Sequence, residues 1–389
     1  MDTSIRLKQN IKYFTLFSLF SGKLFLATTQ VLYFSYRGFG FAEIMLLSSI
    51  TQIVCLVLEI PSGMIADYIG NKKCLELGML FAIIANLVAI NAKNILIAIL
   101  YSLLCAVQES LLSGADQAYL FNLLAKNNNE KTFKDTIRII NSKRMTFVAL
   151  ITLLSGVVYK ISPYMPFLIT TTFYILAFIT VALLEDDHND IKGDVLLKDY
   201  IYAVIDYLKS ESSVIWLLLL NMCYTFLFMN QNVLLQQYLT DIKIPIVTYG
   251  LVFFSFNMVS SYFSKIGRKI ELVLGKNTKM VCTFLMVICL IGAGITASVY
   301  SLFLLACCRG IVAVINPILA ANINNSITDN GKRATILSFY NAASEIPDSI
   351  ASPILGHYID IAGIFSGYVV FGVIGLIPIG ISAIIDKNR

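Results

Sequence analysis

Long apolar runs without a charged residue alternate with short polar segments along most of the chain. The longest uncharged runs are 161–184, 212–240, 244–264, 280–308 and 361–385. Each reaches the roughly 20 residues that an α-helix needs to cross the hydrocarbon core of a bilayer. These runs and the polar breaks between them predict twelve spans, at about 12–36, 42–64, 74–92, 95–122, 144–162, 165–184, 213–238, 246–264, 279–297, 300–324, 334–356 and 362–385. The predicted fold class is therefore an all-α membrane protein with twelve transmembrane helices.

Composition agrees with a membrane protein and argues against a soluble enzyme. Hydrophobic residues make up 57% of the 389 residues and charged residues 14%, whereas soluble domains carry about 25% charged residues. The 8 cysteines lie within or at the ends of apolar segments and lack the spacing of a metal site. The sequence shows no phosphate-binding loop and no nucleophile–base pair. We therefore expect no enzymatic activity, no metal and no cofactor, and energy from an ion gradient rather than from ATP.

The longest polar segment, 185–212, divides the predicted spans into six and six. The domains expected are an N-terminal half at 1–184, a cytoplasmic linker at 185–212 and a C-terminal half at 213–389. Apolar residues recur at helical spacing in the second part of the linker, which favours an amphipathic helix on the membrane surface. The acidic first part also fits a disordered linker.

The distribution of Lys and Arg predicts the orientation in the membrane. With the N-terminus inside, 23 of them fall on the cytoplasmic face and 4 on the outer face. Such a bias follows the positive-inside rule, so both termini are expected to be cytoplasmic in the cell inner (plasma) membrane. The net charge of +5 is explained by this bias, and no nucleic-acid partner is expected.

Three pairs of loops suggest an internal repeat. Residues 66–73, 128–133 and 156–163 align with 263–270, 330–335 and 356–363, at offsets of 197, 202 and 200. A nearly constant offset predicts two homologous halves in parallel orientation. This design is typical of secondary transporters, whose substrate site lies near the midplane between the halves.

The polar segment between the second and third predicted spans reads GMIADYIGNKK. It resembles the signature loop of the major facilitator superfamily, roughly Gly-x-Leu-Ala-Asp-Arg-x-Gly-Arg-Lys, through Gly63, Ala66, Asp67, Gly70 and Lys72. The preceding EIPSG is similar to a bacterial branch whose members are often labelled drug exporters. The resemblance implies a twelve-helix transporter of the drug/proton antiporter type.

The resemblance also implies a cytoplasmic gate in this loop. In the family, the carboxylate that matches Asp67 docks at the start of the eleventh span and a neighbouring cation. Asn71 replaces a usual arginine here, so the expected cations are Lys72, Lys73 and Arg333. We expect Gly63 to permit close helix approach and Gly70 to adopt positive φ. The alternative is an ordinary solvated turn.

The second-half copy of the gate is expected to lack its carboxylate. The offset of 197 places Ser260, Ser264 and Gly267 where the first half has Gly63, Asp67 and Gly70. An asymmetric gate follows from this alignment.

Several ionisable residues fall inside predicted spans, where each costs several kcal/mol unless it meets a partner or a cavity. They are Lys23 in span 1, Glu109 and Asp116 in span 4, Arg309 in span 10, and Glu345 and Asp348 in span 11. The resemblance implies that spans 1, 4, 7 and 10 line a central cavity. Every one of these residues is therefore a candidate functional residue.

Glu109 and Asp116 are the candidates for proton coupling. They are seven residues apart, which places them on one face of a continuous helix with Ser113 between them. Carboxylates in poorly hydrated cavities favour the protonated form, as a proton carrier requires. Lys23 is expected to oppose Glu109. The alternatives are a purely structural Lys23–Glu109 pair and a capping role for Asp116.

The other candidates for substrate contact are Asn221 and Tyr224 in span 7, Asn316 in span 10, and Arg309. Amides and aromatic rings suit an amphipathic ligand, although aromatic residues also face lipid. Arg309 is expected either to pair with Glu345 or Asp348, or to meet an anionic group of the substrate.

These observations predict a proton-coupled exporter of small amphipathic molecules that works by alternating access. The alternative is an importer or uniporter of a polar or zwitterionic metabolite such as an amino acid or peptide. A membrane enzyme or lipid scramblase is a third possibility. The expected partners are a small-molecule substrate, protons and the lipid bilayer, and the expected state is a monomer.

Overall fold

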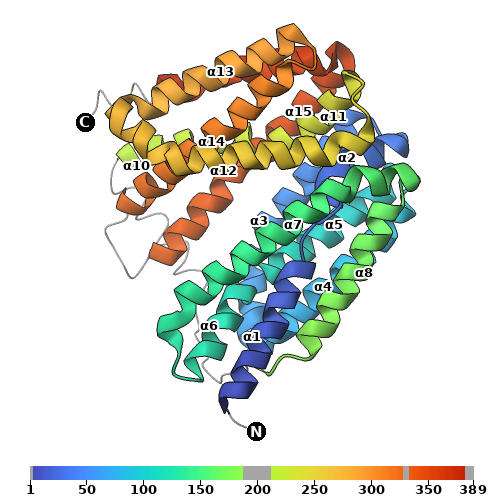
Figure 1. Cartoon of the computed structure of the whole chain (residues 1–389), viewed down its shortest axis with the longest axis vertical. Helices are drawn as coiled ribbons and strands as arrows, with labels where there is room; N and C mark the ends of the chain where they lie inside the picture. The colour runs from blue at the N-terminus through green and yellow to red at the C-terminus, as the bar shows by residue number, and fades with distance from the viewer. Residues whose placement is uncertain (1–2, 187–211, 327–332, 382–389) are drawn as a thin grey trace. The chain divides into compact units, whose positions relative to one another are not determined.

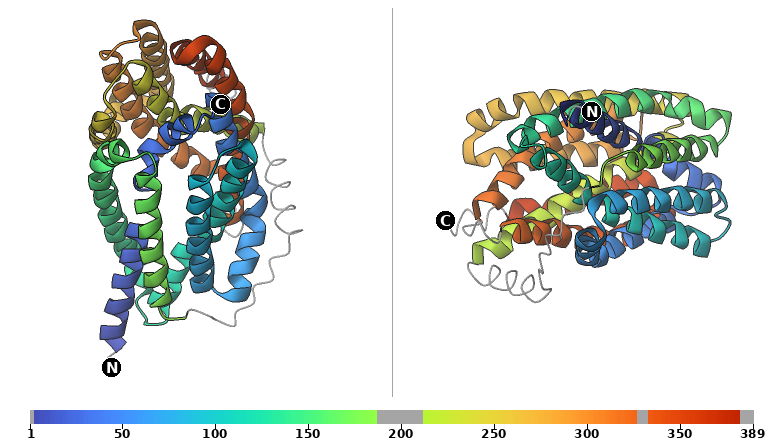
Figure 2. Two further views of the ribbon diagram at one scale, coloured as in Figure 1. Left: turned by 90° about the vertical axis from the view of Figure 1, so that its right-hand side faces the viewer. Right: turned by 90° about the horizontal axis from the view of Figure 1, so that it is seen from below.

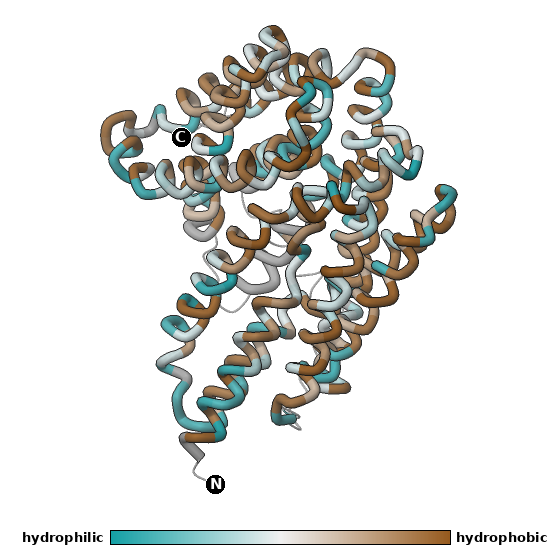
Figure 3. Tube along the Cα trace, turned by 45° about the vertical axis from the view of Figure 1, so that its right-hand side comes forward, coloured by the Kyte–Doolittle hydropathy of each residue, from teal (hydrophilic) through white to brown (hydrophobic). Residues whose placement is uncertain are grey.

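A computed structural model describes residues 3–186, 212–326 and 333–381. Every regular element in these ranges is a helix, as the apolar runs predicted. Apolar residues extend along most of the helical length, and polar segments gather at the helix ends (Figure 3). The predicted linker lies almost entirely outside the described residues.

The chain forms two compact units. The first comprises Met1–Phe39 and Ile50–Asp194, and the second comprises Gly40–Ser49 and Val195–Arg389. The long helix α3 therefore begins in the second unit and continues in the first. This division was not predictable from the sequence, because the predicted span 42–64 runs across it without a polar break.

The first unit is a helical bundle (Figures 1 and 2). Helix α4 packs against both α5 and α8, and α1 packs against α8. The core combines small and aromatic side chains, including Ala82, Ala177 and Tyr119, and the small ones allow neighbouring helices to approach closely. The helices are α1 Thr3–Phe20, α2 Leu26–Tyr36, α3 Phe41–Ile69, α4 Asn71–Ile90, α5 Ile95–Leu112, α6 Ala115–Ala125, α7 Phe133–Ile161 and α8 Met165–Ala182.

The second unit is also a helical bundle. Helix α14 packs against α12 and α13, and α15 packs against α13 and α10. Non-helical φ and ψ at Gly363 (83° and 162°) divide α15 into two arms. The helices are α10 Ser212–Met229, α11 Gln231–Asp241, α12 Tyr249–Leu274, α13 Thr278–Thr296, α14 Ser301–Ser326 and α15 Arg333–Ile374.

Ten helical segments in the described residues are long and apolar enough to cross a membrane, which establishes a multi-pass protein. The predicted number of twelve stays a prediction. The last segment, Ala343–Ile381, has 39 residues, about twice the length that one crossing requires. Helices α1 and α2 are not among the ten, because α1 carries Arg6, Lys8 and Lys12 and α2 has only 11 residues.

Three predicted spans are broken rather than continuous. The first is interrupted between α1 and α2, the fourth between α5 and α6, and the seventh between α10 and α11. Positive φ marks two of the breaks, 34° at Leu24 and 79° at Gly114. Discontinuous helices free backbone groups and side chains at membrane depth, and transporters place binding sites at such breaks.

The loop between α3 and α4 consists of Gly70 alone. Its φ of 89° confirms the predicted positive φ, which a residue with a side chain rarely adopts. The Gly70 amide donates to the Ala66 carbonyl (2.9 Å), and the Gly70 carbonyl accepts from the Cys74 amide (3.3 Å). One glycine thus ends one helix and starts the next.

The predicted alignment of this loop with the second half is wrong in register. Gly267 lies inside α12, where a Cβ would be 3.7 Å from Val314. The glycine that ends α12 is Gly275, with φ 54°. The offset between Gly70 and Gly275 is larger than the predicted offset of 197, so Ser260 and Ser264 are not the counterparts of Gly63 and Asp67.

Candidate functional site

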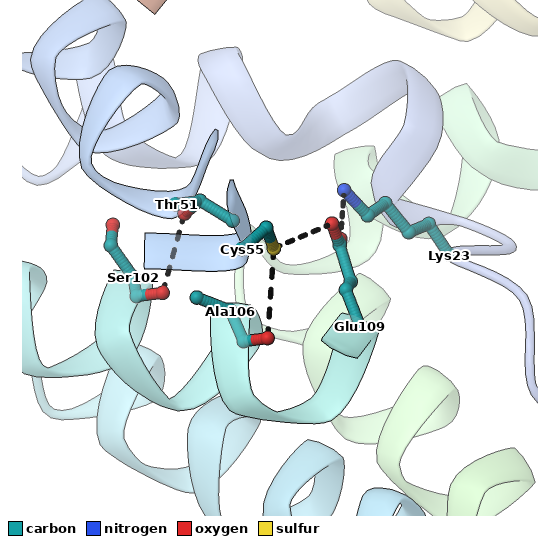
Figure 4. A network of polar contacts seen from close by, with 6 residues as sticks. All are labelled: Lys23, Thr51, Cys55, Ser102, Ala106 and Glu109. Carbon is teal, nitrogen blue, oxygen red and sulfur yellow. Dashed lines mark hydrogen bonds and ion pairs between the residues drawn. The ribbon is translucent and has the colours of Figure 1, made fainter. Parts of the chain in front are cut away.

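Lys23 and Glu109 form an ion pair in the first unit, and Glu109 lies in a helical segment that is long and apolar enough to cross a membrane. Lys23 lies in the break between α1 and α2, and Glu109 lies in the last turn of α5 (Figure 4). Lys23 Nζ is 2.8 Å from Glu109 Oε1. This contact agrees with the predicted opposition of the two residues. The break directs the lysine, because residues 21–25 leave the helical path just before Leu26.

The pair is open rather than sealed in the core. The side chain of Lys23 is 57% exposed and that of Glu109 is 36% exposed. A fully packed pair would be fixed by its neighbours, whereas this one leaves surface on both partners for a proton, water or a ligand. A carboxylate inside a span is costly without a counter-ion, so Lys23 stabilises the charge of Glu109.

Helix α3 supplies the remaining polar contacts of Glu109. Cys55 Sγ lies 3.9 Å from Glu109 Oε2 and 3.6 Å from the Ala106 carbonyl oxygen. One turn away, Thr51 Oγ1 donates to the Ser102 carbonyl oxygen at 3.3 Å. Figure 4 shows these side chains of α3 directed toward α5. They anchor α3 to the helix that carries Glu109.

Asp116 does not share a helical face with Glu109. Residues Ser113 and Gly114 separate α5 from α6, so the predicted seven-residue register is broken. Asp116 is in the first turn of α6, and its Oδ1 accepts from the Gln117 amide at 2.7 Å. A carboxylate at a helix N-terminus is stabilised by the helix dipole. The structure favours the capping role for Asp116.

Lys72 of the gate motif pairs with acidic residues other than Asp67. Its Nζ is 3.3 Å from Asp186 Oδ1 and 3.9 Å from Glu76 Oε1. Asp67 is exposed and forms no ion pair with any residue in the described ranges. The loop is thus joined to the segment that leaves α8.

The other gate residues make few contacts within their units. Lys73 is exposed. A Cβ built on Gly63 would have no atom of the described residues within 4 Å, so the predicted close helix approach is not made in this structure. Arg333 begins α15, and its side chain lies outside the described part. Docking of the gate stays a prediction.

Asp348 belongs to a buried polar cluster in the second unit. Its Oδ1 accepts from Asn230 Nδ2 and from the Ser352 hydroxyl, the latter at 2.7 Å. The same hydroxyl lies 3.1 Å from Asn230 Oδ1. Asn230 is the residue at the break between α10 and α11, so this cluster joins the break to α15.

Arg309 contacts an amide rather than a carboxylate. Its Nη2 donates to Asn232 Oδ1 at 2.5 Å. Within the described residues Arg309 forms no ion pair, and the predicted pairing with Glu345 or Asp348 is not made. Asp348 bonds to Asn230 instead, because the break before α11 directs Asn230 and Asn232 to different neighbours.

The remaining candidates differ in environment. Tyr224 is 1% exposed, and its hydroxyl bonds to that of Thr283, so it is a core residue rather than a cavity residue. Asn221 is half-buried and Asn316 is exposed. Glu345 is half-buried in α15.

Sequence reasoning missed two polar residues of these clusters. Ser352 follows Asp348 by four residues, a spacing that predicts contact on a helix, and this signal could have found it. Cys55 carried no such signal, because its contact with Glu109 depends on how α3 packs on α5.

Comparison with known proteins agrees with this architecture. A model of the Major Facilitator Superfamily matches residues 13–352. The uncharacterized MFS-type transporter YxaM of Bacillus subtilis (strain 168) is 24% identical over 379 residues, covering 92% of this chain and 91% of YxaM.

Solved transporters share the fold at low sequence identity. The nucleoside transporter NupG superposes with a TM-score of 0.76 at 13% identity and covers 100% of both chains. A D-xylose-proton symporter superposes with a TM-score of 0.74 at 10% identity, over 98% of this chain and 97% of the symporter. The chain belongs to the Major Facilitator Superfamily and is a multi-pass membrane transporter.

Proposed function

We propose that the protein is a proton-coupled exporter of small amphipathic molecules, in which Glu109 carries the proton and Lys23 is its counter-ion. The observation that supports this assignment is the open ion pair between Lys23 Nζ and Glu109 Oε1, 2.8 Å apart at the break between α1 and α2. A proton carrier needs a carboxylate that a proton can reach and whose charge matters to its surroundings. Glu109 meets both requirements.

Protonation of Glu109 removes the charge that stabilises the Lys23 ammonium. An unpaired ammonium in a membrane is unfavourable, so Lys23 gains from moving toward water or toward a different partner. Lys23 sits where α1 ends and α2 begins, and Leu24 there has positive φ. A change at this break reorients two helices. In the proposal, this change is coupled to alternating access of the two halves around a midplane site.

The cytoplasmic gate completes the proposal. Asp67 is exposed and faces solvent or a partner outside its own unit, and the one-residue turn at Gly70 holds it at the end of α3. We propose that Asp67 docks at the start of α15 near Arg333 when the inner side closes. Lys73 is a further cation of this gate.

Import of a polar or zwitterionic solute is the second candidate function. The Lys23–Glu109 pair favours it, because opposite charges 2.8 Å apart match the two ends of a zwitterion. The direction of the coupling gradient distinguishes the two functions. Export requires proton and substrate to move in opposite directions, and symport requires them to move together.

Reconstitution in proteoliposomes tests the proposal. The probes are 4-phenylbutane-1-sulfonate and 4-phenylbutyltrimethylammonium, two amphiphiles whose charge is independent of pH. An acidic lumen is expected to drive uptake of one of them, and Glu109→Gln is expected to abolish this uptake. Asp135→Asn is the matched control, since Asp135 is an exposed carboxylate whose ion pair in the described part of the chain is with Arg138 at 3.5 Å.

Three results bear on the proposal. Gradient-driven uptake by Glu109→Gln equal to that of the unmodified protein contradicts the role of Glu109. Uptake of an amino acid or peptide driven by an acidic exterior supports the second candidate. Movement of lipids between the two leaflets that needs no gradient indicates a scramblase.

A further inference from the structure

We infer that a pocket of the second unit, lined by Arg309 and Gln231, binds an anionic head group, so that the transported molecule is an amphipathic anion. This inference rests on the proposed transport function and names its substrate class. It concerns a site inside one unit and depends on no contact between the units.

The pocket lies beside the break between α10 and α11. Its polar side chains include Arg309 from α14 and Gln231, the first residue of α11. Its apolar walls include Leu235, Phe256 and Leu305. The free space of the pocket is about 10 Å³, which admits one oxygen atom of a head group beside the two donors rather than a whole ligand.

Arg309 brings an unneutralised charge to this pocket. A guanidinium has five N–H donors and no acceptor, and its hydrogen bond in the described structure is the one to Asn232 Oδ1. An amide oxygen carries no net charge, so it leaves the positive charge of Arg309 without a counter-ion in the described residues. A cation at membrane depth is stable when an anion joins it.

Gln231 provides a second hydrogen-bond donor that lacks an acceptor. The residue is 9% exposed, and its Nε2 is buried without a hydrogen-bond partner. An unsatisfied buried donor costs about 1–3 kcal/mol, so the folded protein gains when an acceptor enters. Arg309 and Gln231 line one pocket, and both require an acceptor.

The carboxylate of Asp348, a predicted partner of Arg309, is engaged elsewhere. Asp348 accepts hydrogen bonds from Asn230 and Ser352. Asn230 directly precedes Gln231, the first residue of α11. Within the described residues Arg309 has no carboxylate partner and Gln231 Nε2 has no acceptor, so an acceptor that enters the pocket meets both donors. A carboxylate, sulfonate or phosphate provides an oxygen for each donor and a charge for the guanidinium.

The first unit offers the opposite arrangement. There Lys23 already has its counter-ion in Glu109 at 2.8 Å. The two units thus divide the tasks: Glu109 exchanges a proton, and Arg309 holds the substrate anion. A cationic amphiphile is disfavoured by the charge of Arg309, and a neutral one lacks the ion pair.

Equilibrium binding in nanodiscs tests this inference without a proton gradient. The full-length protein is titrated with radiolabelled 4-phenylbutane-1-sulfonate, in competition with 4-phenylbutyltrimethylammonium and 4-phenylbutanol, which share the phenylbutyl body. Because charge-assisted hydrogen bonds contribute more than neutral ones, we expect the sulfonate to bind at least about tenfold more tightly than the other two.

Two substitutions locate the site. Arg309→Gln removes the charge, and Gln231→Glu leaves Arg309 in place but supplies it with an internal anion. Each is expected to weaken sulfonate binding by about tenfold or more. Arg268→Gln is the control, since Arg268 is exposed on α12 of the same unit. This variant is expected to bind the sulfonate as tightly as the unmodified protein.

The outcomes separate this inference from the proposed function. Equal or tighter binding of the ammonium compound, or unchanged sulfonate binding in both Arg309→Gln and Gln231→Glu, overturns the inference. Gln231→Glu decides if Arg309→Gln does not fold. If sulfonate binding depends on Arg309 but a proton gradient drives no uptake, the anion site is supported and the proposed proton coupling is contradicted.

Discussion

Asp360 caps the start of α3, a helix that begins at Phe41, more than three hundred residues earlier in the chain. Its Oδ1 accepts from the Phe41 amide at 2.9 Å, and its Oδ2 accepts from the Ala42 amide at 2.8 Å. The first amides of a helix have no intrahelical partner and carry the positive end of the helix dipole. A single carboxylate satisfies two of them. Gly356, one turn earlier on α15, lets α3 approach closely, because a Cβ there would be 2.8 Å from the Ala42 Cα.

Removal of this cap is expected to destabilise the second unit. Asp360→Ala leaves two amides of α3 without their acceptor, and loss of an N-terminal cap costs about 0.5–2 kcal/mol. The measurement is the midpoint of thermal unfolding in detergent. Asp135→Ala is the control because Asp135 is exposed and bonds only within its own helix. Equal midpoints for the two variants would show that the Asp360 contacts contribute nothing.

The Lys23–Glu109 pair is expected to show energetic coupling. Lys23→Gln leaves a carboxylate without its cation in the membrane, whereas the double variant Lys23→Gln/Glu109→Gln leaves neither charge. We expect the double variant to be more stable than the sum of the single effects predicts, with a coupling of about 0.5–3 kcal/mol. The midpoints of thermal unfolding of the unmodified protein, the two single variants and the double variant provide the double-mutant cycle. Strict additivity would contradict a direct interaction.

Gly70 is expected to tolerate no side chain. Its φ of 89° and ψ of 150° lie in a region that is almost confined to glycine, so Gly70→Ala should lower the stability by about 1–3 kcal/mol. Gly63→Ala is the matched comparison, because a Cβ there has open space, and its stability should be unchanged. Denaturation midpoints compare the two. A Gly70→Ala protein as stable as Gly63→Ala would refute the conformational argument.

Asp116 is expected to be dispensable for proton coupling. It belongs to the first turn of α6, beyond the Gly114 break, and bonds to the Gln117 amide. Asp116→Asn should therefore retain gradient-driven uptake of the charged amphiphiles, with a loss of about 0.3–1 kcal/mol in stability from the weaker interaction with the helix dipole. Uptake assays with an acidic lumen measure this. Loss of uptake as complete as in Glu109→Gln would contradict this expectation and show that proton coupling requires Asp116.

The sequence predicted the helical fold and the Lys23–Glu109 contact, because uncharged runs and charges inside them are readable without coordinates. The breaks were not predictable in the same way. Leu24 adopts positive φ although leucine disfavours it, so the break depends on tertiary packing rather than on local preference. The partner of Arg309 was missed for a related reason. Asn230 and Asn232 are two residues apart and point in different directions on a helix, and the packing of α14 and α15 against them decides which meets Asp348 and which meets Arg309.

Proton coupling through Glu109 is tested most directly by two transport modes of one variant. Exchange of labelled for unlabelled substrate needs the transport cycle but no net proton movement, whereas accumulation against a concentration gradient needs the proton. Glu109→Gln proteoliposomes with 4-phenylbutane-1-sulfonate are expected to retain exchange and to lose accumulation driven by an acidic lumen. Accumulation by Glu109→Gln at the level of the unmodified protein, under the same proton gradient, would contradict the assignment of Glu109 as the proton carrier.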